Sequence, residues 1–312
     1  MRGLLVTSTR LGDAILSTGV LGWMLERGLS VTVACGPVAA PLFEDVPGVA
    51  RVIPMRKGQM GAHWRRLWAE TVGTRWDLVV DLRGSAFAWT VAAGERRVFR
   101  APATQDHRVD QLASALDLSP TPEPRLWLSG THHAQAADIL GDDPRPILAL
   151  CPTANWPPKA WPADRFVDLT EALTGVGPLM DARILVAGGP NERELAAPVL
   201  DAIPEDRRID LVGTAPLMVL AACLARCALV VANDSGLMHL AAASGAPTLG
   251  LFGPSKDAHY APRGPITDFV RGDVAADTLL ARSDDVAGAA GSLMQDLRTA
   301  RVLEAARGLL NV

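Results

Sequence analysis

The sequence predicts an α/β protein made of two Rossmann-like domains in tandem. Its 312 residues exceed one ordinary compact domain and suit two, each large enough to bury a core. Short apolar runs alternate with amphipathic stretches in both halves, which is typical of parallel sheets covered by helices on both faces. We therefore expect a first domain over residues 1–130 and a second over 131–312, whose C-terminal helices could pack back on the first.

The first half contains five runs of strand length, separated by helical stretches. They span Gly3–Thr7, Ser30–Ala34, Val49–Ile53, Asp77–Leu82 and Arg96–Phe99. Gly28 stands where the helix before the second strand should end, because a glycine just past a helix readily adopts the left-handed conformation that terminates it.

A proline-rich stretch separates the two series of strands. Residues 118–125 (LSPTPEPR) are predicted to form an extended linker, and GDDPRP before Ile147 has a similar composition. The domain boundary is expected between these two stretches. After Asp273 the chain is predicted to be helical and carries no recognisable chemistry. The second series of strands spans Ile147–Cys151, Arg183–Ala187, Ile209–Val212, Ala228–Ala232 and Thr248–Phe252.

Composition excludes several classes of protein. Hydrophobic residues make up 49% and charged residues 21%, which is typical of a globular chain. The net charge of -4 argues against nucleic acid as a general partner. The first apolar run has only five residues, too few for a signal peptide or a membrane span, so a cytoplasmic protein is expected.

The four cysteines do not indicate a metal site. All lie in apolar stretches, and Cys223 and Cys227 have the i, i+4 spacing of a helix rather than the CxxC spacing of zinc ligands. Buried free thiols are the favoured interpretation.

The first candidate site is TSTRLGDAILSTG, residues 7–19, where a strand leads into a helix. Such loops face the ligand crevice of an open α/β sheet, and Gly12 would permit a tight turn there. Asp13 could contact a substrate or cap the helix, and spacing alone favours the cap. This loop contains no GxGxxG and the chain no GxxxxGK, so dehydrogenase and P-loop interpretations lose their main support.

The strongest local signal is the stretch 229–255, in which an apolar strand leads into Asn233, Asp234, Ser235 and Gly236 at the start of a helix. Free N–H groups at a helix start form an anion site suited to a diphosphate. Capping of the helix by Asp234 or Ser235 is the alternative.

Two further loops supply polar groups. In CPTANWPPKAWPADRF, residues 151–166, Thr153 and Asn155 offer hydrogen bonds and Lys159 a charge that could neutralise phosphate, although a lone lysine is usually just solvated. In VAGGPNERE, residues 186–194, Glu192 could accept from ribose hydroxyls or simply occupy a favourable helix N-terminus. The tryptophans of the first loop are better explained by packing than by stacking on a ligand.

Basic residues gather in the first half. They could form a surface for an acidic acceptor, although arginines on solvated faces are common. The group comprises Arg10, Arg83, Arg96, Arg97 and Arg100, with His63, Arg65 and Arg66 nearby in sequence.

Together these segments resemble glycosyltransferase family 9, the ADP-heptose:lipopolysaccharide heptosyltransferases, over nearly the whole chain. The family pattern is RxGD near the N-terminus, a KxWP loop opening the second domain, and DSGxxHxAAAxGxPxxxLFGP. Here these stand, in the same order, at residues 10–13, 159–162 and 234–254.

The resemblance implies a GT-B fold and an inverting, metal-independent transfer of heptose from ADP-heptose to the lipopolysaccharide inner core. The first domain would bind the acceptor, a lipid-anchored acidic oligosaccharide, in a cytoplasmic enzyme at the inner face of the membrane. Asp13 would be the general base. The acceptor-binding residues would include Arg10, Gly12 and Arg83.

The second domain would bind the nucleotide sugar. Lys159, with Thr153 or Asn155, would hold the diphosphate and stabilise the leaving ADP in place of a metal ion. Asp234 would accept from hydroxyls of the donor sugar, and Glu192 would lie near the adenosine. The amides that contact phosphate would be those of Ser235, Gly236 and Leu237.

Two departures from the family bear on the donor. The loop reads PTANWPPKAWP where many members have a glycine-containing GAxxGPAKRWP, and residues 216–219 lack the family's Ser-Leu-x-Glu type sequence. Two alternatives stay open: the same chemistry with another nucleotide sugar or acceptor, and a non-catalytic protein that binds a sugar nucleotide. Retention of Asp13, Lys159 and Asp234 together argues against the second.

Overall fold

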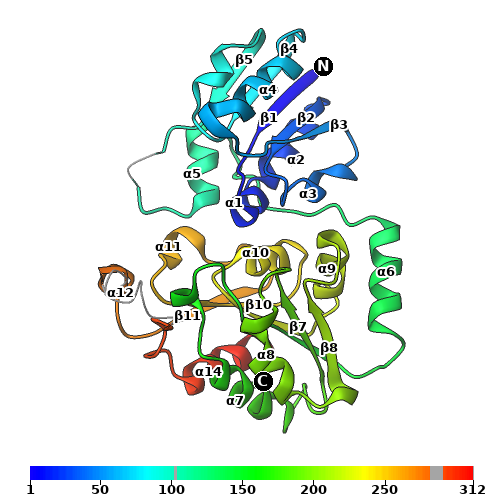
Figure 1. Ribbon diagram of the computed structural model, residues 1–312, viewed down its shortest axis with the longest axis vertical. Helices are drawn as coiled ribbons and strands as arrows, with labels where there is room; N and C mark the ends of the chain where they lie inside the picture. Colours follow the sequence, from blue (N-terminus) through cyan, green and yellow to red (C-terminus); the bar gives the residue numbers. More distant parts are fainter. Residues whose placement is uncertain (102–103, 282–290, 312) are drawn as a thin grey trace. The chain divides into compact units, whose positions relative to one another are not determined.

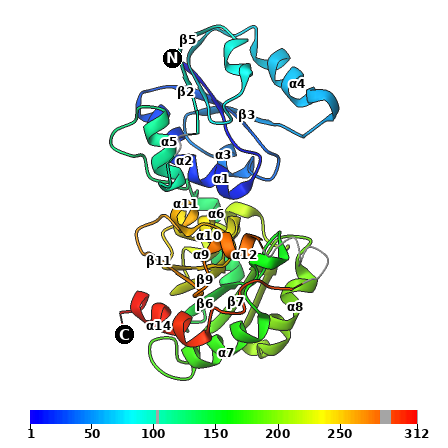
Figure 2. The same cartoon turned by 90° about the vertical axis from the view of Figure 1, so that its left-hand side faces the viewer.

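The computed structural model describes residues 1–101, 104–281 and 291–311 and shows two α/β units (Figures 1 and 2). The first unit comprises Met1–Trp127 and the second Leu128–Val312. No helix or strand is formed over residues 118–128, which include the predicted linker.

The first unit contains a five-stranded parallel sheet in the order β3-β2-β1-β4-β5. The strands are β1 (Arg2–Val6), β2 (Ser30–Cys35), β3 (Val49–Pro54), β4 (Trp76–Asp81) and β5 (Ala93–Val98). The helices are α1 (Leu11–Leu16), α2 (Thr18–Glu26), α3 (Pro41–Glu44), η1 (Gln59–Gly61), α4 (Ala62–Thr71), η2 (Ala86–Trp89) and α5 (Arg108–Ala115).

All five predicted strands of this unit are present. The fifth begins at Ala93 rather than Arg96, because Ala93 and Glu95 pair with β4 although this part of the strand gives no apolar signal. Gly28, two positions after the last residue of α2, has φ +73°, so the predicted glycine terminator is confirmed.

The second unit contains a six-stranded parallel sheet in the order β11-β10-β9-β6-β7-β8. The strands are β6 (Ile147–Cys151), β7 (Arg183–Gly188), β8 (Arg208–Val212), β9 (Leu229–Asn233), β10 (Thr248–Phe252) and β11 (Thr267–Arg271). The helices are α6 (Gly130–Leu140), η3 (Pro157–Lys159), α7 (Ala163–Thr174), α8 (Arg193–Ala202), η4 (Glu205–Arg207), α9 (Leu217–Leu224), α10 (Gly236–Ala243), α11 (Asp257–Tyr260), α12 (Ala276–Ala281) and α14 (Thr299–Leu309).

The sequence missed β11 because this edge strand is mostly polar. Val270 is its one buried residue, at 9% exposure. The central strands are easier to recognise because both of their faces are covered, which makes them continuous apolar runs. All five residues of β6, for example, are buried.

The end of the second unit packs into its own core. Val302 and Ala306 of α14 are fully buried among side chains from the sheet and α7. The apolar face of α14 is thus filled within the second unit, and packing of the C-terminal helices on the first domain stays a prediction. The part of the predicted helical stretch that falls on residues 282–290 lies outside the described residues.

Each sheet has one point where the strand order reverses, between β1 and β4 in the first unit and between β6 and β9 in the second. At such a point the loops that leave the carboxyl ends of the two strands diverge and open a crevice. The predicted site residues follow these four strands and β7. The fold therefore brings the predicted loops of each unit to one edge of its sheet.

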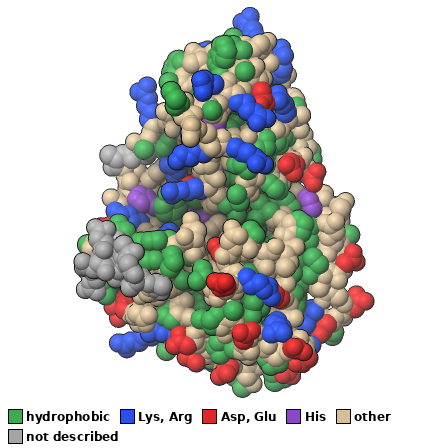
Figure 3. All heavy atoms as spheres, in the orientation of Figure 1, with side chains coloured by type: hydrophobic (Ala, Val, Ile, Leu, Met, Phe, Trp, Pro, Cys, Tyr) green, Lys and Arg blue, Asp and Glu red, His purple; other side chains and the backbone are tan. Residues whose placement is uncertain are grey.

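Charge is unequally divided between the units. Residues 1–127 carry 15 Lys and Arg against 12 Asp and Glu, whereas residues 128–312 carry 15 against 22. On the face drawn in Figure 3 the acidic side chains accordingly gather on the second unit. No helix in the described ranges combines the length and apolar character needed to cross a membrane.

The cysteines are free and buried, as predicted. Burial, followed by the nearby Glu44 carboxylate, raises the pKa of Cys35 to about 12. Burial, followed by Glu192, likewise raises the pKa of Cys151 to about 12. These thiols stay protonated at neutral pH and act as small apolar side chains.

Candidate functional site

The predicted donor-binding residues lie on three loops at the carboxyl edge of the second sheet and, for Gly236 and Leu237, at the start of α10. These loops follow β6, β7 and β9, which are adjacent and parallel. They comprise residues 152–161, 189–192 and 234–235, and we refer to them as the three-loop site. It lies at the point where the order of the second sheet reverses.

Lys159 and Asp234 form an ion pair across this point. Lys159 ends η3, and its Nζ donates a hydrogen bond of 2.6 Å to Oδ2 of Asp234. The aspartate is 6% exposed, whereas the lysine side chain is 25% exposed. A nearly buried carboxylate requires such a partner because desolvation penalises an unpaired charge. Lys159 is therefore not a solvated surface lysine.

Neither Asp234 nor Ser235 caps α10 with its side chain, so the capping interpretation of this stretch is wrong. Ser235 occupies the N-cap position with extended backbone, but it makes no side-chain capping bond. Its Oγ is buried and has no hydrogen-bond partner among the described residues. A buried hydroxyl without a partner is costly unless a ligand or water supplies one. The half-buried Gly236 and Leu237 begin the helix at this point.

Glu192 and Thr153 form a second contact within the three-loop site. Oε2 of Glu192 accepts from Thr153 Oγ1 at 2.5 Å and from Gly189 N at 2.7 Å. Glu192 occupies the N-cap position of α8 but does not cap it through its side chain. Thr153 is 2% exposed and Asn155 is exposed on the same loop. The structure thus commits the Thr153 hydroxyl to Glu192 and leaves the Asn155 amide facing solvent.

Packing accounts for Trp161, as the sequence favoured. The ring is 2% exposed and meets Phe166 edge to face, with the centroids 5.0 Å apart. Its Nε1 donates to Leu297 O at 2.8 Å. The sequence assigned no role to Asn233, the last residue of β9. This residue is fully buried and bonds the loop that carries Lys159. Its position directly before Asp234 was the available signal.

In the first unit Asp13 is the third residue of α1, not its cap. The N-cap is Arg10, in extended backbone, and it makes no side-chain capping bond. Gly12 lies inside α1, so the predicted tight turn at Gly12 is wrong: the extended Arg10 already turns the chain into the helix. Asp13 is partly exposed, and from the described residues its carboxylate accepts one long contact, of 3.5 Å from Ser8 Oγ. Its carboxylate is therefore available to another group.

Arg83 follows β4, the neighbour of β1, and is exposed. Its guanidinium lies over the Trp64 ring, 4.7 Å from the centroid. Its backbone N donates to Asp81 Oδ1 at 2.9 Å, and Ser85 N donates to Oδ2 at 3.0 Å. Asp81, which the sequence did not single out, is fully buried and shapes the loop that presents Arg83.

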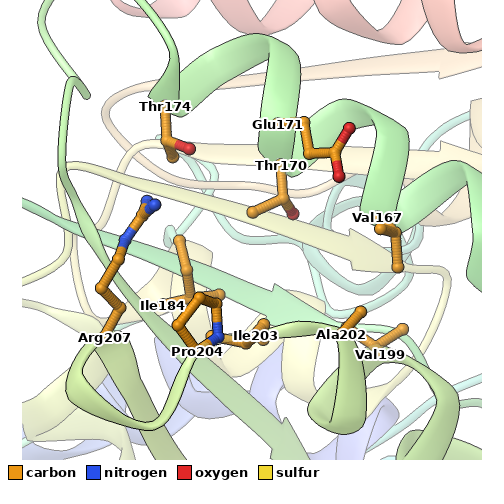
Figure 4. Close-up of a pocket in the computed structure, with 10 residues that line it drawn as sticks. All are labelled: Val167, Thr170, Glu171, Thr174, Ile184, Val199, Ala202, Ile203, Pro204 and Arg207. Atoms are coloured by element: carbon orange, nitrogen blue, oxygen red, sulfur yellow. The ribbon is translucent and has the colours of Figure 1, made fainter.

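A pocket of about 220 Å³ lies elsewhere in the second unit (Figure 4). Helix α7 contributes three polar side chains and Val167 to its lining, and the segment from α8 to η4 contributes apolar residues and Arg207. Ile184, from the amino end of β7, completes it. None of the predicted site residues lines it. In the part of the chain that the structure describes, no group of three or more His, Cys, Asp or Glu is placed to hold a metal ion.

Comparison with known proteins gives three kinds of match. The sequence model of glycosyltransferase family 9 (heptosyltransferase) matches residues 95–278. Lipopolysaccharide heptosyltransferase 1 of Pseudomonas aeruginosa is 30% identical over 305 residues, 82% of this chain and 79% of that protein. Lipooligosaccharide heptosyltransferase 2 of Haemophilus influenzae is 30% identical over 176 residues, 55% of this chain. Lipopolysaccharide heptosyltransferase 2 of Salmonella typhimurium is 28% identical over 199 residues, 61% of this chain.

The last two matches span about half the length of the relatives, 49% of the Haemophilus protein and 56% of the Salmonella protein. Solved structures match more completely. A glycosyl transferase family 9 structure from Veillonella parvula has a TM-score of 0.82 at 21% identity, with 99% of this chain and 97% of that chain covered. Escherichia coli ADP-heptose lps heptosyltransferase II has a TM-score of 0.77 at 23% identity, with 100% and 99% covered. These likenesses confirm the predicted GT-B fold.

Proposed function

The chain belongs to glycosyltransferase family 9, and from that premise we propose that it transfers a heptose from ADP-heptose to the inner core of lipopolysaccharide. The observation that carries the proposal is the Lys159–Asp234 pair at the reversal point of the second sheet, beside the start of α10. The names of the curated relatives support the sugar and the acceptor.

We propose that the donor's diphosphate lies against Lys159 and the start of α10. An ammonium has three N–H donors, so Lys159 can hold Asp234 with one and phosphate oxygens with the others. The amides of Ser235, Gly236 and Leu237 add the anion affinity of a helix start. Together they would stabilise the charge that develops on the departing ADP, which is the role a metal ion has in other transferases.

The remaining donor contacts follow from the loops. Asp234 would accept hydrogen bonds from sugar hydroxyls with the carboxylate oxygen that Lys159 leaves free. Glu192 already accepts two hydrogen bonds, and its second oxygen can accept from a ribose hydroxyl. Thr153 would hold Glu192 in place, and the exposed Asn155 would reach the diphosphate.

For the transfer itself we propose Asp13 as general base. The acceptor hydroxyl oxygen forms a bond to the anomeric carbon while its proton passes to the Asp13 carboxylate. The bond from that carbon to the diphosphate oxygen breaks, and its electron pair leaves with ADP. Attack opposite the leaving group inverts the anomeric centre.

The acceptor would be bound by basic residues of the first unit, with Arg10 on the loop that leads to Asp13 and Arg83 on the loop after the neighbouring strand β4. Residues 51–100 carry ten Lys and Arg against four Asp and Glu. Such an excess favours an acidic oligosaccharide on a lipid anchor.

We also propose that this unit contacts the inner face of the membrane through α4 and η2. Trp68 and Trp89 are 45% and 65% exposed, and Trp68 Nε1 donates to Thr90 O, next to Trp89. Arg65 is exposed three residues before Trp68 on the same helix face. Tryptophan beside arginine suits the interface of an anionic bilayer. Sedimentation with anionic vesicles should fall on Trp68→Ser with Trp89→Ser, and binding that depends on neither tryptophan would contradict this surface.

Calorimetric titration with ADP, UDP and GDP in the presence of EDTA tests the donor site, its base preference and its metal independence together. Selective ADP binding supports the proposal. Preference for UDP or GDP would redirect the donor, and absence of binding would favour a protein without transferase activity. Release of ADP from ADP-heptose in the presence of a heptose-deficient acceptor then tests the reaction.

A further inference from the structure

One buried amide side chain binds both ends of the loop that carries Lys159. Asn233, at the end of β9, is 0% exposed. Its Nδ2 donates to Pro152 O at 2.8 Å, and its Oδ1 accepts from Trp161 N at 3.0 Å. A carbonyl can only accept and an N–H can only donate, so these two partners fix the orientation of the amide. Residues 152–161 between them are the Lys159 loop.

This loop needs hydrogen bonds from residues outside it to hold its conformation. Three of its ten residues are prolines, which have no N–H to donate. Within the loop, Lys159 N bonds Trp156 O and Ala160 N bonds Pro157 O. A segment near the C-terminus supports the other side, because Leu293 N donates to Pro158 O at 3.0 Å. The hydrogen bonds of Asn233 tie the loop to the sheet itself.

We propose that Asn233 is a positioning residue, which holds the Lys159 loop so that the ammonium meets Asp234 and the donor's diphosphate. Asn233 then holds the loop and the adjacent Asp234 holds the lysine, so both are fixed relative to the end of β9. Asn233 touches no reacting group and acts through Lys159. The identity of the diphosphate ligand rests on the proposed function. The two hydrogen bonds by which Asn233 holds the loop do not depend on it.

Loop order is measured by hydrogen exchange of the amides in residues 153–161 of the intact protein. In Asn233→Ala these amides, Trp161 N above all, should exchange at least about 10-fold faster than in the unmodified protein. The matched control is Thr248→Val in the neighbouring strand β10, since Thr248 is also 0% exposed and its hydroxyl donates to Ala246 O at the other end of the sheet. Unchanged exchange in Asn233→Ala, or an equal rise in the control, would overturn the proposal.

ADP binding then shows whether Asn233 acts through Lys159. Asn233→Ala should weaken ADP binding by about 10-fold in the unmodified protein and have no further effect in a Lys159→Ala background, because coupled residues are not additive. An equal loss in both backgrounds would refute the positioning role. If Asn233→Ala does not fold, Asn233→Ser is measured against the same criteria.

The two proposals can fail separately. If the unmodified protein binds no ADP, the proposed donor is wrong, and the exchange measurement alone decides the role of Asn233. If ADP binds and the Lys159 loop exchanges as before in Asn233→Ala, the donor stands and the positioning role falls.

Discussion

Lys159 and Asp234 are 75 positions apart in the sequence and are joined by a hydrogen bond of 2.6 Å. Each follows its own strand, and the two strands, β6 and β9, are neighbours in the sheet. The ammonium is the more exposed partner, so it can meet an incoming anion without leaving the aspartate. This relationship brings two motifs that are far apart in the sequence into contact, and it underlies the first prediction.

Lys159→Ala should weaken ADP binding by about 1 to 3 kcal/mol, the range for a charge-assisted contact. Two effects contribute to this loss of binding free energy. The contact between Lys159 and the diphosphate is missing, and the nearly buried Asp234 carboxylate, without its partner, repels the diphosphate. Calorimetry measures it, with Lys57→Ala, an exposed lysine of the first unit, as control. Unchanged affinity in Lys159→Ala would remove this lysine from the site.

Asp13→Ala should lower turnover by roughly 100-fold or more while ADP affinity stays within about 2-fold, as expected for a general base. The matched control is Asp110→Ala, since Asp110 is also the third residue of a helix in the first unit and has the same favourable position in the helix dipole. Both changes remove an interaction with a helix dipole, but only the first removes the proposed general base. Near-normal turnover of Asp13→Ala would leave Asp13 with a structural role alone.

Glu192→Ala should weaken binding of ADP but change the binding of 2′,3′-dideoxy-ADP by less than about 2-fold, because the lost contact is to a ribose hydroxyl. The control is Glu194→Ala, an exposed carboxylate in the first turn of the same helix. Calorimetry with both nucleotides decides the matter. Equal losses for the two nucleotides would mean that Glu192 supports the loop rather than the ribose.

The native thiols should not react with a disulfide reagent at pH 8, whereas all four should react in urea. Burial raises the pKa of Cys35 and Cys151 to about 12 and that of Cys223 to about 11. The folded chain therefore keeps protons that the unfolded chain releases near pH 9. The thiol contribution to stability is present below that pH and is lost as the pH rises toward 11 to 12. Urea unfolding should therefore give a lower free energy of unfolding at pH 10 than at pH 8. A thiol that reacts in the native protein at pH 8 would contradict the prediction of buried, protonated thiols.

Much of the fold could be predicted because the buried strands are apolar on both faces. All ten predicted strands are present, whereas the polar edge strand β11 gave no signal. At the site, the sequence identified the loops but not the contacts of their side chains. Spacing alone favoured Asp13 as a cap, whereas it is the third residue of its helix, and the bond from the Thr153 hydroxyl to Glu192 was not foreseen.

The sequence by itself determined the α/β class, the two series of strands, the family and the loops that carry polar residues, because periodicity and motif spacing are local properties of the chain. Only the tertiary structure decided which of those residues meet. Strand order placed Lys159 beside Asp234, and the role inferred for Asn233 follows from the two backbone groups that it binds. Such contacts depend on which strands are neighbours in the sheet. A hydrogen bond between residues far apart in the chain produces no periodic pattern in the sequence.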